Sequence, residues 1–177
     1  MILNQTSKFE GLEKQTIQIL VKCRSLFIDE VCSASEDTIE SLCDELNPEN
    51  NIKACMELLE DEEFIGKSPL SSEFDDYRPS YMGTLYMVIS KAIQSLDKTS
   101  VTNNFNEIMN VITKGMNHTE VEIRKAALDC LVSLYFVFNE NNSSKTEGGE
   151  KFLNTINNYL TLSQKRILEI YIKKFQY

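Results

Sequence analysis

The chain has 177 residues, which is the length of one domain and long enough to bury a hydrophobic core. Its formal charge of −9 is concentrated in residues 29–76, where sixteen acidic residues meet two lysines and leave the remainder net positive. Because nucleic acids and anionic membranes are bound through Lys and Arg, this distribution argues against both as partners. No apolar stretch approaches the roughly 18 residues that a membrane-spanning helix needs.

The first third of the chain reads as three helices. Ser7 and Glu10 have the spacing of a capping box that opens the first helix. We expect that helix to bury a broad apolar face made of Leu12, Ile17, Ile19, Leu20, Cys23 and Leu26. A second helix follows Ser35, with Ile39, Leu42, Cys43 and Leu46 at steps of three and four. Asn47-Pro48 then predicts a helix end and a new start, since Asn caps a helix and Pro fits its first position.

The rest of the chain continues the helical pattern with two interruptions. Residues 65–80 and 141–149 are rich in Gly, Pro, Ser, Asn and charged residues, and we expect exposed loop insertions there. Helices are predicted at 81–96, 105–116, 120–138, 152–160 and 163–175. The helix at 120–138 is apolar on most sides, so it should be central. The sequence predicts a single all-α domain over 1–177, with about eight antiparallel helices stacked as an α-solenoid in preference to a closed bundle.

No motif points to catalysis. Gly66-Lys67-Ser68 resembles the tail of a phosphate-binding loop, but Asp61 stands where that motif requires glycine. His118 is the only histidine, which excludes a two-histidine metal site. The five cysteines show no Cys-x-x-Cys pair and are expected to be buried thiols. We therefore predict no enzyme activity, no metal and no cofactor.

Two segments carry a family resemblance. Residues 104–135 are similar to a HEAT repeat, with a turn at 116–119 and the opening Val121, Ile123, Arg124, Lys125 and Ala126 of a second helix. Together with residues 160–176, which include Leu160-Thr-Leu-Ser and Tyr171-Ile-Lys, they resemble the C-terminal TOG-like HEAT-repeat domain of the CLASP family, the microtubule-associated cytoplasmic linker-associated proteins. The two insertions and the Asn/Lys-rich composition suggest a divergent, fungal member.

The resemblance implies a C-terminal fragment of a longer microtubule-stabilising protein that docks to spindle, kinetochore or plus-end adaptor proteins and forms a homodimer. It implies localisation to the cytoplasm, cytoskeleton, mitotic spindle and kinetochore, with a nuclear location in a closed mitosis. Direct tubulin binding is not expected, because the chain lacks Trp and its early turns are acidic or neutral. The alternative is a helical-repeat scaffold fragment from trafficking or nuclear transport, unrelated to microtubules.

Three regions are candidate interaction or modification sites. On the last helix we expect Ile167, Leu168, Tyr171, Ile172 and Phe175 to dock on the preceding repeat, leaving a partner-binding surface of Lys165, Arg166, Ile170, Lys173, Lys174 and Tyr177. Acids and aromatics in 61–76 and just after it, with Phe64, Phe74 and Tyr77, could bind a basic segment. Ser68-Pro69 is a candidate phosphorylation site. The alternatives are an ordinary solvated helix face for the first region and a disordered insert for the second.

Overall fold

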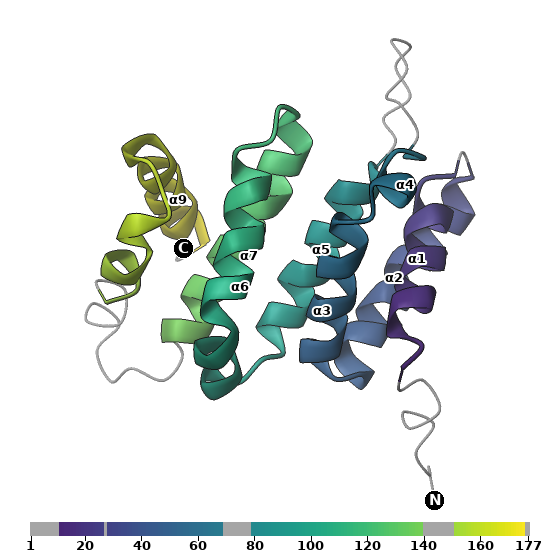
Figure 1. Cartoon of the computed structure of the whole chain (residues 1–177), viewed down its shortest axis with the longest axis horizontal. Helices are drawn as coiled ribbons and strands as arrows, with labels where there is room; N and C mark the ends of the chain where they lie inside the picture. Colours follow the sequence, from purple (N-terminus) through teal and green to yellow (C-terminus); the bar gives the residue numbers. More distant parts are fainter. Residues whose placement is uncertain (1–10, 27, 69–78, 140–150, 176–177) are drawn as a thin grey trace, which may run out of the picture.

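The computed structural model describes residues 11–26, 28–68, 79–139 and 151–175, and within them it is entirely helical (Figure 1). The predicted all-α class is therefore confirmed, and the arrangement is compatible with a helical-repeat solenoid. The elements in chain order are α1 Glu13–Arg24, α2 Asp29–Glu45, α3 Pro48–Leu59, α4 Glu62–Ile65, α5 Tyr81–Gln94, α6 Lys98–Met116, α7 Val121–Asn139, the 3₁₀ turn η2 Ile156–Asn158, and α9 Leu162–Phe175. Residues 151–155 are also helical.

The helices pack as successive antiparallel pairs, α1 with α2, α3 with α5, and α6 with α7 (Figure 1). The pairs stack side by side, so that α1 and α2 form one end and α9 forms the other. Packing is most extensive between α5 and α7, at the centre of the stack. The prediction of a central helix at 120–138 is thus confirmed as α7, and α5 shares that position.

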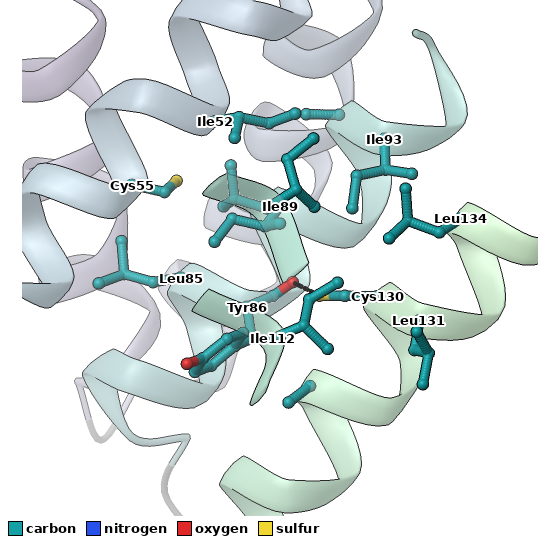
Figure 2. Packing of buried hydrophobic residues seen from close by; sticks show 14 of the residues in the cluster. Ile52, Cys55, Leu85, Tyr86, Ile89, Ile93, Ile112, Cys130, Leu131 and Leu134 are labelled. Carbon is teal, nitrogen blue, oxygen red and sulfur yellow. Dashed lines mark hydrogen bonds between the residues drawn. The ribbon is translucent and has the colours of Figure 1, made fainter. Parts of the chain in front are cut away.

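The core passes through four helices in this central region. Figure 2 shows Cys55 of α3, Leu85 and Ile89 of α5, Ile112 of α6 and Leu131 of α7 converging on one apolar cluster, and all of them are almost fully buried. Such close packing excludes water from the space between the helix pairs. Burial of this much apolar surface is the main source of stability in a chain that forms no disulfide in its described part.

Gly115 allows α6 to approach α5 and α7 closely. A Cβ atom at this position would lie 2.5 Å from Cζ of Tyr86 and 2.7 Å from Cβ of Ala127, both nearer than van der Waals contact permits. The hydroxyl of Tyr86 donates to the Val111 carbonyl at 2.9 Å, which fixes the ring between α5 and α6. The smallest residue is therefore required here by packing.

Several sequence expectations need correction. The first described helix, α1, buries Ile17 and Val21 and leaves Ile19 exposed, because a helix at the end of a stack has one covered face. Leu12 and Leu26 are exposed as well and lie just outside the two ends of α1. The predicted capping pair Ser7 and Glu10 lies outside the described residues. The helix predicted at 105–116 begins earlier, at Lys98, where the Asp97 carboxylate accepts the Ser100 amide at 2.8 Å as an N-cap.

Other boundaries agree or differ in detail. Asn47 caps α3 as predicted, its side chain accepting the Glu49 amide at 2.8 Å. In place of one helix over 152–160, the structure has an α-helical segment at residues 151–155 that is followed by the 3₁₀ turn η2. The short helix α4 was not predicted; the Asp61 carboxylate caps it by accepting the Phe64 amide at 3.0 Å. Most of the 65–80 insertion and all of the 141–149 insertion lie outside the described residues.

Candidate interaction surface

The turns of neighbouring helix pairs are joined along one edge of the stack. Ser25, after α1, donates to the Pro79 carbonyl at 2.7 Å, and Arg24 donates to Thr84 of α5 at 2.9 Å. At the far end, the Gln164 side chain of α9 donates to Asn117, in the turn between α6 and α7, at 3.0 Å. These hydrogen bonds link the first pair to α5 and α9 to the third pair, so the edge is held in one geometry.

A reciprocal capping box starts α9. The Gln164 side chain accepts the Thr161 amide at 2.9 Å, and the Gln164 amide donates to the Thr161 hydroxyl at 3.3 Å. The helix is then anchored by Leu168 and Ile172, which are buried, while Tyr171 is half-buried. Ile167 was expected on this inner face, but it is 45% exposed, because it lies about a quarter-turn away from Leu168.

The outward side of α9 is basic with an apolar centre. Ile170 is 65% exposed, and Arg166, Lys173 and Lys174 are exposed around it. Lys165 differs, because its ammonium group donates to the backbone carbonyl and the side-chain oxygen of Asn157 at 3.1 Å and 2.7 Å. The structure therefore brings most of the predicted surface together, but it places Lys165 in contacts within the domain. Partner binding by all of these residues stays a prediction.

The other candidate positions fall in two groups. Phe74, Tyr77 and Tyr177 lie outside the described residues. Phe64, which we expected beside them in an exposed acidic segment, is instead buried and stacks on Tyr81 with ring centroids 4.9 Å apart. Ser68 is half-buried, and its hydroxyl oxygen accepts the Tyr81 amide at 3.0 Å, at the start of α5. Phosphorylation of Ser68 would act on this helix start and stays a prediction.

The described thiols are suited to packing. Burial raises the pKa of the Cys43 thiol to about 11, and burial also holds the pKa values of Cys55 and Cys130 well above the ordinary value. At neutral pH these groups are uncharged and are poor nucleophiles. Cys130 lies with its sulfur 3.0 Å from the Tyr86 carbonyl (Figure 2), which satisfies its weak donor.

The single histidine also has a structural contact. Nδ1 of His118 accepts the Glu120 amide at 3.1 Å, in the turn that precedes α7. Arg124 donates to the His118 and Thr119 carbonyls at 2.8 Å and 2.6 Å, so this turn is closed by its own polar groups. Within the described ranges, no group of three or more His, Cys, Asp or Glu side chains could hold a metal ion. None of the described helices is long and apolar enough to cross a membrane.

Charge is distributed unevenly along the stack. Helix α2, at the first end, carries seven acidic residues and no basic one. Two of these acids are used inside the domain, since Glu36 pairs with Arg24 and Glu40 pairs with Lys91. Helix α9, at the opposite end, carries four basic residues and one acid, Glu169. The most acidic helix and the most basic helix named here therefore lie at opposite ends of the stack (Figure 1).

Comparison with known proteins agrees with the sequence resemblance. The chain is 24% identical over 176 residues to CLIP-associating protein 1-A and to CLIP-associating protein 1-B of Xenopus laevis. It is 23% identical over the same length to CLIP-associating protein 1 of Xenopus tropicalis. These similarities support a CLASP-like relationship. They cover 99% of this chain but only 10% of each relative, so the chain spans about a tenth of their length. No protein-family model matches the chain.

Proposed function

We propose that this chain is a non-catalytic protein-interaction domain of a CLASP-like, microtubule-stabilising protein. Its task is to dock that protein to spindle, kinetochore or plus-end partners. The distant similarity to CLIP-associating proteins over the whole chain supports the family part of this proposal. The fungal source and the TOG-like character belong to the same proposal and rest on the sequence pattern alone.

The outward side of α9 carries the proposal. Ile170 is an exposed aliphatic residue surrounded by Arg166, Lys173 and Lys174, on a helix whose inner side is anchored by Leu168 and Ile172. Binding free energy is most favourable where an apolar anchor lies inside a charged rim, because burying the anchor removes it from water. The charged rim then sets the specificity for the partner. An amphipathic helix with acidic flanks fits this surface.

The charge of the chain supports the exclusion of tubulin as a direct partner of this domain. The acidic helix α2 and the acids around α4 would repel an acidic surface. The isolated chain is therefore expected to stay in the supernatant when microtubules are pelleted. Pelleting with microtubules at physiological salt would assign tubulin binding to this domain and remove the adaptor role as its main task.

Localisation in dividing cells tests the adaptor role. We expect that Lys173→Glu with Lys174→Glu removes the tagged protein from spindle, kinetochore and plus-end positions, because the rim would repel an acidic partner. The matched control is Lys173→Arg with Lys174→Arg, which keeps the charge, and Lys53→Glu controls for a charge reversal at an exposed position of α3. Unchanged localisation of the Glu variant, at an unchanged melting temperature, would exclude the basic rim.

A further inference from the structure

Helix α9 is attached to the stack by a small part of its surface. Its main neighbour is α7, and this packing is far less extensive than the packing of α7 on α5 or on α6. Among the described side chains of α9, Leu168 and Ile172 are buried and Tyr171 is half-buried. Because a helix of 14 residues is marginally stable in water on its own, α9 depends on this docking to stay helical.

The segment just before α9 is anchored independently of it. Phe152 and Leu160 are buried. The ring of Tyr159 meets the Phe105 ring of α6 edge-on, with centroids 6.1 Å apart, and its hydroxyl donates to the Asn106 side chain at 2.6 Å. The chain is therefore fixed to the stack up to Leu160, so a movement of α9 away from α7 would pivot at the residue that follows.

One side chain both starts α9 and ties it to the stack. Oε1 of Gln164 accepts the Thr161 amide at 2.9 Å and the Thr161 hydroxyl at 3.0 Å, which caps the helix. Nε2 of the same side chain donates to Oδ1 of Asn117 at 3.0 Å and to the Met116 carbonyl at 3.5 Å, at the end of α6 and in the turn after it. The two ends of one amide group therefore couple the start of α9 to its docking.

The partner surface proposed on α9 depends on the helical state. Arg166, Ile170 and Lys174 are exposed and four residues apart, so they share one side of the chain only while it is helical. If α9 unwinds, these side chains are spread along a flexible segment. A partner would then have to order α9 before binding it, which weakens the apparent affinity by the fraction of molecules in which α9 is docked.

We propose that Gln164 is a latch that regulates the partner surface. While its hydrogen bonds are made, α9 is helical and docked; when they open, α9 undocks as one unit and the rest of the stack stays folded. The proposal rests on the proposed function of α9 and adds regulation of that same site. By linkage, a partner that binds the outward side holds the latch closed.

Hydrogen exchange on the 177-residue chain measures undocking directly, since one opening exposes the α9 amides together. In the parent, the α9 amides should exchange faster than those of α5 and α7. Gln164→Ala removes both the cap and the tie, so exchange in α9 should rise by about tenfold, while α7 and residues 151–155 keep the rates of the parent. Parent α9 amides that exchange no faster than those of α7, or an equal rise in both helices, would overturn the latch.

Single variants separate the cap from the tie. Thr161→Ala removes the hydroxyl of the cap, and Asn117→Ala removes the acceptor of the tie. Each should raise exchange in α9 by less than Gln164→Ala does. Asn110→Ala, at an exposed position of α6, is the matched control and should exchange as the parent does. An Asn117→Ala chain that also exchanges as the parent does would contradict the tie and with it the latch.

Localisation separates the latch from the adaptor role. Gln164→Ala combined with Leu168→Ala should leave α9 undocked in most molecules, so the tagged protein should lose its localisation although no residue of the outward side has changed. If this variant keeps its localisation while charge reversal at Lys173 and Lys174 abolishes it, regulation by the latch is overturned. If both variants keep their localisation, the adaptor role fails, and the exchange rates alone decide whether Gln164 latches α9.

Discussion

In α5, hydrophobic side chains are buried on nearly every side of the helix, whereas α9 buries Leu168 and Ile172 and leaves Ile167 and Ile170 exposed. Both helices have 14 residues, but α5 has neighbours on several sides and α9 has them on one. The comparison teaches that the centre of this stack is specified by packing, while its ends retain apolar side chains beyond those that folding requires. Substitutions should therefore affect stability at the centre and association at the ends.

The largest effect is expected at Gly115, in the centre. Gly115→Ala places a methyl group against the Tyr86 ring and Ala127, and relieving that overlap must move α6 from α5 or α7. We expect a loss of about 3 kcal/mol in unfolding free energy, at the upper end of overpacking effects, measured by chemical denaturation. The control is Gly83→Ala, where the methyl meets the ends of two side chains, the Glu122 carboxylate at 2.8 Å and the Ser80 hydroxyl at 3.0 Å, and should cost less because these ends can shift. Equal melting curves for both variants would contradict the close approach of these helices.

The next effect separates the two sides of α9. Leu168→Ala should lower stability by about 2 kcal/mol, because it removes a completely buried side chain. Ile170→Ala should change it by less than about 0.5 kcal/mol, since the side chain is mostly exposed. Hydrogen exchange on Leu168→Ala should show faster exchange of the α9 amides, while the α5 amides stay protected. A similar loss in both variants would mean that α9 is covered on both sides.

Asn51 offers a smaller gain in stability. Its side chain is fully buried, and neither amide atom has a hydrogen-bond partner among the described residues. Asn51→Leu keeps a similar volume and removes the cost of burying an unpaired amide, so we expect a gain of about 1 kcal/mol in thermal or chemical unfolding. Asn50→Leu should give no such gain, because Asn50 already donates to Glu13 at 3.2 Å. A destabilised Asn51→Leu protein would show that the amide is satisfied in solution.

The smallest effect depends on pH. Burial raises the pKa of the Asp129 carboxyl above its ordinary value, and Lys125 only partly opposes this. The folded state therefore holds this proton more tightly than the unfolded state, and stability is lost as the pH rises through the folded pKa. Asp129→Asn should be more stable than the parent at neutral pH, and the difference should disappear below the ordinary pKa of a carboxyl. Thermal melts at neutral and acidic pH measure it, and a difference that persists in acid would contradict this cause.

The sequence predicted the starts of helices well where a cap or a turn preceded the apolar pattern. Asn47 with Pro48 placed the start of α3, and the turn before Val121 placed α7. The start of α6 was missed, because the Asp97 cap precedes a polar first turn in which only Val101 is apolar and buried. α4 was missed because four residues give no periodicity; the signal was Asp61 followed three residues later by the buried Phe64.

The exposed side of the helix was predictable on α9 but not on α1. Spacing alone separated Ile170 from Leu168 and Ile172, since these positions fall on opposite sides of a helix. On α1 we assigned Leu12, Ile19 and Leu26 to the core, because hydrophobic residues at helical spacing do not reveal which side a neighbour covers. Only the packing of α2 and α3 against Ile17 and Val21 decides it. Whether a helix lies at the end of a stack depends on tertiary packing, which the spacing of its own apolar residues does not reveal.

The central claim is that the exposed side of α9 binds a partner, while the interior of the stack maintains the fold. Its most direct test is the localisation of Ile170→Asp in dividing cells, measured beside its melting temperature. We predict an unchanged melting temperature together with loss of the protein from the spindle, kinetochore and plus-end positions that the proposed function gives it. A protein that keeps both its stability and its localisation would contradict the account, because the exposed side of α9 would then have no role in binding.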